Sequence, residues 1–372
     1  MKRRILLIAI VLVGLGFASC SKRTVTSDND LRDPSLSQEY IESYKPSSEK
    51  INFNAAEFPT TKGPVQTSEK LIDMVLFTYY TPAALGEQIY DSNQAPSDNN
   101  LAGKERNFMN NQKVTRTDAS SPWTYSPIKY WPNNADDRLH FFAYAPFSAY
   151  KRITFPKIDI SVLEFYNSDT HVDYIAAKKM NQKKTSSAVD LKFYHLMSRV
   201  RFGFRNAYNK ADIYMTVAEI RMSNLIGEGE TDFSSGDDIP FIKANPDGVK
   251  YPVRLPPEGV KDDRIDYESD ETKYTPVVKE GTADKNYDMY LLPQTLSSDV
   301  KIEIEIDVWK KKPAPDTDYF KEEHIKLITQ LDSSITLEGG KTYQINISYD
   351  PPIGLWANAV ELWTQVDNDQ EI

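Results

Sequence analysis

The sequence predicts an all-β protein made of two tandem antiparallel β-sandwiches. The segment from Val300 to Val308 alternates strictly between apolar and charged residues, which is typical of a strand with one buried and one solvent-facing side. The chain has 22 Tyr, 16 Phe and 5 Trp, and 22 Pro against 15 Gly, a composition that favours sheets joined by proline-containing loops. No segment has the pattern of a long, capped amphipathic helix. With 372 residues, the chain is also longer than one hydrophobic core usually organises.

The N-terminus has the pattern of an export signal over residues 1–19. Three basic residues, Lys2 to Arg4, precede the apolar run from Ile5 to Val13. The segment from Phe17 to Cys20 resembles a bacterial lipobox, in which the cysteine is acylated, and Cys20 is the single cysteine of the chain. We therefore expect a lipid anchor at Cys20, with an ordinary secretory signal as the alternative. Residues 20–50 are polar and rich in serine, and we expect them to form a flexible tether or pro-segment.

Short apolar runs predict the strands of a first domain over residues 51–186. The first run alternates between apolar and polar residues, and the later ones are nearly continuous. The candidate strands are Ile51–Ala55, Leu71–Tyr80, Leu139–Ala145 and Val172–Ala177. The segment from Asn181 to Ser187 is charged and rich in small residues, so we place the domain boundary there.

The second domain is predicted to span residues 187–372. Apolar residues alternate from Val189 to Phe204, with His195–Ser198 between the two halves, and predict one long, bulged strand. Further candidate strands are Val217–Leu225, Tyr287–Leu292, Val300–Val308 and Thr342–Tyr349. Residues 227–285 are rich in Gly, Pro, Asp and Glu and are expected to form long surface loops. Because Glu303 lies on the charged side of its strand, we expect reversal of its charge to be nearly silent.

The sequence contains no motif that predicts catalysis, so we expect a non-enzymatic protein without a cofactor or a metal. Nucleophile-elbow, phosphate-loop, zinc-protease and EF-hand motifs are missing, and the four histidines are scattered. The net charge of −10 argues against nucleic-acid binding. Trp123 and Trp131 lie among prolines and tyrosines, where they either plug one end of a sandwich or stack on sugar rings. The second interpretation would make the protein a glycan-binding surface lipoprotein that does not polymerise.

A series of short motifs resembles the fimbrillin family, the lipoprotein pilins of Bacteroidia-type (type V) fimbriae. The matching stretches, in family order, are the lipobox ending at Cys20, INFNA (51–55), TTKG (60–63), YWP (130–132), LHFFAYAP (139–146), VDLKFYHLMSRVRF (189–202), EIRMSNL (219–225), YLLPQ (290–294), GGKTYQINI (339–347) and V-x-x-W (360–363). The resemblance implies two tandem transthyretin-like β-sandwich domains and a structural role in cell-surface fimbriae that support adhesion.

The resemblance also implies how such a protein assembles. Family members travel to the outer membrane as lipoproteins, and a trypsin-like proteinase cuts shaft subunits after a basic residue beyond the first strand. The matching pair here is Lys62 and Gly63, where the family usually has arginine at the first position. The cut would remove the strand that carries Ile51, Phe53 and Ala55, and a strand from a neighbouring subunit would fill the groove. Anchor and accessory subunits share the fold without needing the cut. The implied partners are other fimbrial subunits, the outer membrane through the lipid, and host or bacterial surface ligands.

The C-terminal segment from Leu355 to Ile372 is the candidate donor strand. Its large apolar residues are Trp356, Val360, Leu362, Trp363 and Val366. On a strand, all of these except Trp363 would share one face, which suits the filling of an apolar groove. On a helix, Trp356, Val360 and Trp363 would form one stripe instead. Packing of the segment on its own domain is the remaining alternative.

Overall fold

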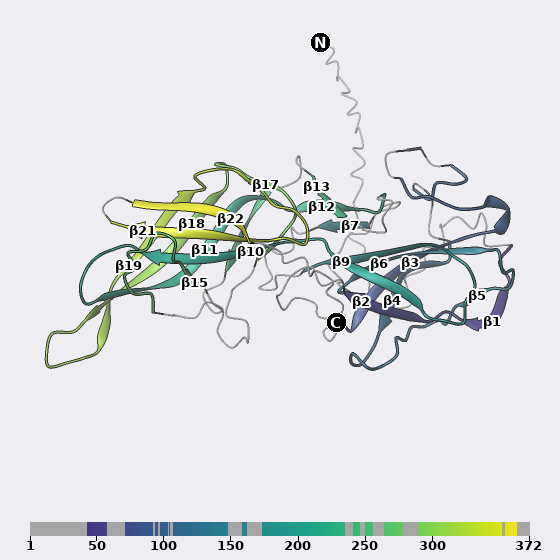
Figure 1. The fold of residues 1–372 in the computed structure, drawn as a ribbon, viewed down its shortest axis with the longest axis horizontal. Helices are drawn as coiled ribbons and strands as arrows, with labels where there is room; N and C mark the ends of the chain where they lie inside the picture. Colours follow the sequence, from purple (N-terminus) through teal and green to yellow (C-terminus); the bar gives the residue numbers. More distant parts are fainter. Residues whose placement is uncertain are drawn as a thin grey trace, which may run out of the picture.

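The computed structural model describes residues 43–57, 71–91, 94–95, 97–102, 104, 107–147, 158–161, 173–234, 241–245, 250–255, 264–277, 289–351 and 354–362. These residues form an elongated body with two groups of strands placed end to end (Figure 1). The described residues contain many β-strands and no α-helix; their one named helix is the short 3-10 helix η2 (Ala83–Leu85). The all-β fold class predicted from the sequence is thus confirmed.

A six-stranded sheet forms most of the first half. Its strand order is β2 (Phe53–Glu57), β9 (Val189–His195), β8 (Ile175–Gln182), β6 (Arg138–Ala145), β3 (Asp73–Thr81) and β4 (Met109–Thr115). All neighbours are antiparallel except β2 and β9, which run parallel. A separate antiparallel pair, β1 (Pro46–Lys50) and β5 (Tyr130–Pro132), follows the start of the described chain.

Both faces of this sheet are buried, which explains why its central strands have continuous apolar sequences. Along β3, Met74 and Leu76 belong to one hydrophobic cluster, while Val75 and Phe77 belong to a second cluster on the opposite face. A strand that is covered on both sides has no solvent-facing positions to fill with polar residues. The second cluster continues into the other half of the molecule, where it includes Phe202.

Two sheets with a shared core form the second half. The first has the order β15 (Thr275–Pro276), β10 (Ser198–Asn206), β21 (Thr342–Asp350) and β22 (Gly354–Leu362), and β16 (Met289–Leu291) also pairs with β10. The second has the order β14 (Lys250–Leu255), β11 (Ile213–Ile226), β18 (Lys301–Lys311) and β19 (Tyr319–Gln330). A small pair, β17 (Thr295–Leu296) and β20 (Ile335–Thr336), lies beside them. Strands β10 and β21 are parallel, a second exception to the antiparallel pattern predicted from the sequence.

The alternating segment from Val300 to Val308 buries its apolar side chains, as the sequence predicts. All five aliphatic residues at its even positions are at most 4% exposed, and β18 lies between β11 and β19. On the other face, the Glu303 carboxylate contacts the guanidinium of Arg221 and lies 2.8 Å from Lys326 Nζ. Glu303 is therefore part of an ion-pair network, which a reversal of its charge would disturb.

The long strand predicted from Val189 to Phe204 is wrong, because this stretch forms β9 and β10 in two different sheets. Leu196 and Met197, which lie between them, are both buried where the chain crosses from one half to the other. The first sheet consequently continues to His195, beyond residue 186, and the polar segment from Asn181 to Ser187 contains the turn between β8 and β9.

Residues 227–285, expected to be loops, contain strands that connect the two halves. β12 (Glu228–Asp232) pairs with β13 (Phe241–Ala244) and also with β7 (Ile158–Ser161), which comes from the first half of the chain. Phe233 follows β12, and its ring packs edge-to-face against Phe142 of β6 at 5.1 Å between centroids. The buried ammonium of Lys178 on β8 donates a hydrogen bond to the carbonyl of Phe233 at 2.7 Å. Aromatic packing and a charged hydrogen bond thus join the two halves.

Candidate functional site: the N-terminal strand and its groove

The described chain begins with a segment, residues 43–57, that lies along the margin of the first sheet. Its first strand, β1, pairs with β5, and its second, β2, is the outermost strand of the six-stranded sheet (the purple strands in Figure 1). An outermost strand has a neighbour on one side only, so its removal breaks one ladder and leaves the rest of the sheet connected. We call residues 43–57 the N-terminal segment.

Apolar side chains of the N-terminal segment complete the first hydrophobic cluster. Ile51 is fully buried, Phe53 is 4% exposed and Ala55 is half-buried against the same cluster. The Phe53 ring makes edge-to-face contacts with Phe141 of β6, at 5.6 Å between centroids, and with Tyr125, at 5.7 Å. The three residues that the family resemblance assigns to the displaced strand therefore pack in one hydrophobic cluster, and we call the surface they cover the groove.

Backbone hydrogen bonds hold the same segment on both sides. The amide of Ile51 donates to the carbonyl of Lys129 at 3.1 Å, and its carbonyl accepts from the Tyr125 hydroxyl at 2.9 Å. On the other side, the Val189 amide donates to the carbonyl of Asn52 at 2.8 Å. Burial raises the pKa of Tyr125 to about 12, so this hydroxyl remains a donor at neutral pH. The segment is bound as an added peptide strand would be, through backbone groups and alternate side chains.

Tyr44 attaches the beginning of the N-terminal segment. Its ring packs edge-to-face against Phe108 and Tyr80, at 5.1 and 5.6 Å between centroids. Its hydroxyl donates to the carbonyl of Tyr130 at 2.8 Å, and burial raises its pKa. The contacts of the segment therefore extend from Tyr44 to β2.

Strand β9 depends on the N-terminal segment for most of its pairing. Residues Val189 to Phe193 are in register with β2, whereas β9 meets β8 in only two register pairs, at Tyr194 and His195. Loss of β2 would leave the first five residues of β9 without a strand partner among the described residues. An unpaired apolar edge of this kind readily takes up another strand.

The other residues singled out in the sequence have different positions. Cys20, Lys62 and Gly63 lie outside the described residues, as do Trp363 and Val366. Residues Gly354–Leu362 form strand β22, so the helical alternative is wrong for this part of the C-terminal segment. β22 is antiparallel to β21 over nine register pairs, in which Trp356, Val360 and Leu362 are opposite Ser348, Gln344 and Thr342. The candidate donor thus pairs with its own domain in the isolated chain.

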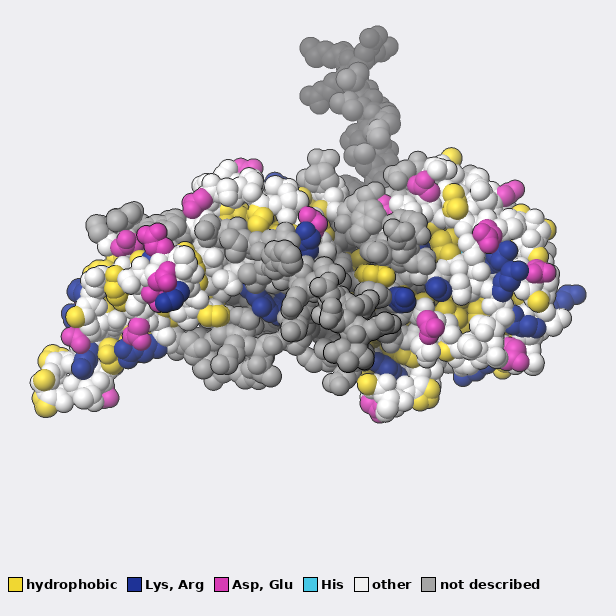
Figure 2. Space-filling view, viewed as in Figure 1, with side chains coloured by type: hydrophobic (Ala, Val, Ile, Leu, Met, Phe, Trp, Pro, Cys, Tyr) yellow, Lys and Arg dark blue, Asp and Glu magenta, His cyan; other side chains and the backbone are white. Residues whose placement is uncertain are grey.

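Trp123 and Trp131 do not form an exposed platform. They are 7% and 0% exposed and belong to the first hydrophobic cluster, and the Arg116 guanidinium lies 4.6 Å above the Trp123 ring. On the face shown in Figure 2, hydrophobic side chains occur in small groups between charged ones. These two tryptophans are therefore part of the hydrophobic core, and they do not form the exposed platform that the glycan-binding alternative requires.

The sequence alone did not identify Tyr125, which contacts both Ile51 and Phe53. It lies in the stretch from Asp118 to Pro132, which the sequence indicates to be a proline-containing loop, and its only signal was the density of aromatic residues there. The described residues hold no group of three or more His, Cys, Asp and Glu side chains suited to a metal ion. Among them there is also no helix long and apolar enough to cross a membrane.

We expect Phe53→Ala to destabilise the N-terminal segment strongly. Truncation of a buried phenylalanine costs about 3–5 kcal/mol, and here it would also remove two edge-to-face ring contacts. Limited proteolysis at increasing urea concentration should show the segment released at lower denaturant than in the unmodified chain. Asn54→Ala is the matched control, because Asn54 is exposed and loses only a 3.0 Å hydrogen bond to Asp190. Equal release in both variants would contradict the packing described above.

Comparison with known proteins agrees with this architecture. A family model described as fimbrillin-like matches residues 88–364. No curated protein sequence matches the chain.

Solved structures are similar to this chain at low sequence identity, and the first of the two described here shares its fold. A fimbrial protein from Bacteroides vulgatus ATCC 8482 has a TM-score of 0.55 and 16% identity, with 84% of this chain and 98% of that chain covered. A putative cell adhesion protein from Bacteroides uniformis ATCC 8492 has a TM-score of 0.44 and 14% identity, with 84% and 98% covered. Because the family model spans well over half of the sequence, the chain belongs to the fimbrillin-like family.

Proposed function

We propose that this protein is a structural subunit or accessory component of cell-surface fimbriae and that its N-terminal segment is a removable strand. Membership of the fimbrillin-like family supports a fimbrial or adhesive role at the cell surface. The observation that carries the finer proposal is the placement of residues 43–57, which fill an apolar groove while forming the outermost strand. Residues 58–70, which contain Lys62, connect this segment to β3 and lie outside the described residues.

Removal of the N-terminal segment would create an acceptor site for another chain. The Tyr125 hydroxyl and the Lys129 carbonyl would lose their backbone partners at Ile51. Phe141 would lose the ring of Phe53, and β9 would lose its parallel neighbour. A strand from a second subunit restores all of these interactions, which makes strand exchange a favourable route to a polymer.

The C-terminal segment from Leu355 is our proposed donor. It contains strand β22, in whose sequence Trp356, Val360 and Leu362 stand at even-numbered positions, together with the polar Asn358. To act as a donor, the segment would have to separate from β21. This separation would break the nine register pairs between β21 and β22. The exchange is therefore favoured only when the acceptor groove offers comparable backbone pairing and apolar burial.

Cleavage after Lys62 is the proposed trigger for assembly. We expect mild trypsin treatment of the purified precursor to yield a ladder of polymers on a non-boiled gel, because trypsin cleaves after lysine and a cut after Lys62 would separate the N-terminal segment from the rest of the chain. Lys62→Ala should abolish the ladder. Truncation before Leu355 should allow the cut but prevent the polymer, and a ladder from that truncated chain would exclude the C-terminal segment as the donor. Complete absence of polymer from the cleaved full chain would favour an anchor or accessory role.

Lipid attachment at Cys20 is the proposed means of anchoring the precursor to the outer membrane. Cys20→Ala should prevent labelling by radioactive palmitate and release the protein from the membrane fraction, since the several acyl chains of a mature lipoprotein hold more firmly than one. Cys20→Ser, which keeps the size of the side chain, should behave in the same way. Unchanged partition of either variant into the outer membrane would show that another interaction retains the protein.

A further inference from the structure

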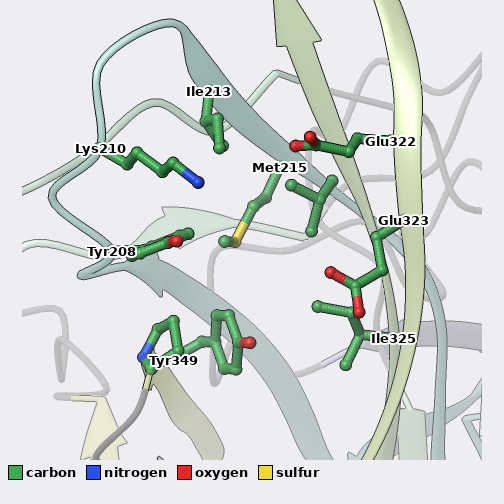
Figure 3. Close-up of a pocket in the computed structure, with 10 residues that line it drawn as sticks. Tyr208, Lys210, Ile213, Met215, Glu322, Glu323, Ile325 and Tyr349 are labelled. Carbon is green, nitrogen blue, oxygen red and sulfur yellow. The ribbon is translucent and has the colours of Figure 1, made fainter.

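An open cavity of about 380 Å³ lies at one end of the second half of the molecule. It is lined by residues from the loop before β11, from β11 itself, from β18 and β19, and from the end of β21, so both sheets contribute to it (Figure 3). The N-terminal segment and its groove share none of the residues that line it. A volume of this size falls within the range of small-molecule sites.

The floor of the cavity is apolar. Met215 is fully buried, and Ile213 and Val308 are 6% and 4% exposed. The rings of Tyr208 and Tyr349 stand on one side of this floor, as Figure 3 shows. The cavity therefore offers a small hydrophobic base flanked by two aromatic rings with hydroxyl groups.

Glu323 is an exposed residue that places a carboxylate at the end of the strand face on which Ile325 and Leu327 lie. It is opposite Val308 in the register of β18 and β19, and the next residues on the same face, Ile325 and Leu327, pack against the core. In the part of the chain that the structure describes, Glu323 forms no ion pair, whereas its neighbour Glu322 is paired with Lys310 at 2.7 Å. Glu323 and Tyr349 both line the cavity (Figure 3), and burial together with the charge of Glu323 raises the pKa of Tyr349.

The opposite wall carries a positive charge. Lys210 reaches toward the cavity in Figure 3, with its Nζ 5.6 Å from the centre of the Tyr208 ring. No carboxylate is paired with Lys210 among the described residues. The cavity thus has a carboxylate and an ammonium group on facing walls, with two tyrosine rings between them on one side (Figure 3).

We propose that this cavity binds a sugar ring of hexopyranose size. A pyranose has an apolar face of C–H groups and a rim of hydroxyls that both donate and accept hydrogen bonds. The cavity has the complementary arrangement, with an apolar floor below Tyr208 and Tyr349 and a rim on which Glu323 accepts and Lys210 donates.

Other small ligands match this arrangement less well. A simple ammonium or guanidinium compound would meet the charge of Lys210, and a simple carboxylate would meet that of Glu323. A free amino acid has both of its charges at one end, whereas the polar groups here lie on opposite walls. A neutral ligand with hydroxyls around its whole rim satisfies both walls at once.

Methionine methyl NMR on the chain from residue 21 onward tests this proposal. Galactose, glucose, mannose, fucose and N-acetylglucosamine are each titrated to about 50 mM, because a single small sugar held by few contacts binds weakly. We expect at least one of them to shift the Met215 methyl resonance in a saturable way. The Met222 methyl, on the same strand but away from the cavity, should not move.

Substitutions at the rim provide the second measurement. Glu323→Gln and Lys210→Met should each weaken binding about tenfold, as expected for loss of a charge-assisted hydrogen bond. Lys301→Met, at the far end of β18, is the matched control and should bind as the unmodified chain does. Unchanged urea midpoints confirm that the variants are folded.

Three results would overturn the proposal. The first is the absence of any saturable Met215 shift with all five sugars. The second is an affinity unaffected by both rim substitutions. The third is a shift caused by free leucine but by no sugar, which would assign the cavity to amino acids.

Discussion

Ile304→Asp is expected to prevent the second half of the molecule from folding. Ile304 is fully buried in β18, with Ile220 of β11 and Leu327 of β19 opposite it in register. The substitution removes the packing of an isoleucine and places an unpaired carboxylate in the core, for a combined cost of several kcal/mol. Because a whole domain is stable by only about 5–15 kcal/mol, this cost is comparable to the total.

Circular dichroism and the yield of soluble protein measure this effect. We expect Ile304→Asp to lose the sheet signal or to accumulate as insoluble protein. Lys301→Asp is the matched control, because it introduces the same side chain at an exposed position of the same strand and should change stability by less than about 1 kcal/mol. Equal damage from both substitutions would contradict the register of β18.

Glu303→Lys is a poorer control than the sequence suggests. The variant lysine would replace the carboxylate that contacts Arg221 and Lys326, and would bring three cations together. Like charges on neighbouring strands destabilise a sheet by about 1 kcal/mol or less, so a measurable cost is expected in place of a silent change. The alternation of the strand predicted which face Glu303 occupies, but not the cross-strand neighbours that surround it.

Sequence periodicity predicts the strands that alternate regularly or are continuously apolar, but it does not predict which strands pair with one another. The alternation of β18 and the continuous apolar run of β3 follow directly from which faces are buried, so both are visible along the chain. The division between β9 and β10 is not visible in the sequence. Leu196 and Met197, which separate the two strands, are apolar and buried, and neither is a residue type that favours turns. The parallel pairs of β2 with β9 and of β10 with β21 join distant segments, and register between distant segments leaves no local pattern.

The same limit applies to the candidate site. Ile51 and Phe53 are apolar at alternate positions, so their burial could be expected from the sequence. Tyr125 could not be identified, because its contact with Ile51 depends on how a proline-containing loop returns to the sheet. The role of Glu323 was equally invisible, since it is one of several exposed charged residues in an edge strand. Only the register with β18, in which Glu323 is opposite the buried Val308, places it at the rim of the cavity.

A chain that begins at Gly63, and so lacks the N-terminal segment, is expected to be monomeric only when a replacement strand is supplied. Its groove would lose the buried side chains of Ile51 and Phe53, each of which contributes about 1.5–3 kcal/mol of burial, and the packing of the partly buried Tyr44. This loss is comparable to the lower end of the stability of an ordinary domain, about 5 kcal/mol. Alone, this chain should therefore associate or bind a hydrophobic dye, as judged by size-exclusion chromatography and fluorescence.

Addition of a synthetic peptide of residues 43–57 should reverse the association, because it restores the pairing with β5 and β9 and refills the groove. The same peptide with Phe53→Ala should bind far more weakly, since the ring contacts with Phe141 and Tyr125 carry much of the burial. A peptide of residues 354–372 tests the proposed donor directly, and competition between the two peptides would place both in one groove. If the shortened chain stays monomeric, binds no dye and unfolds at the same urea concentration as the full chain, the N-terminal segment is not a strand that the fold needs. Strand exchange at this groove would then be excluded, because a chain whose stability does not fall when its own strand is removed would not be stabilised by a donor strand.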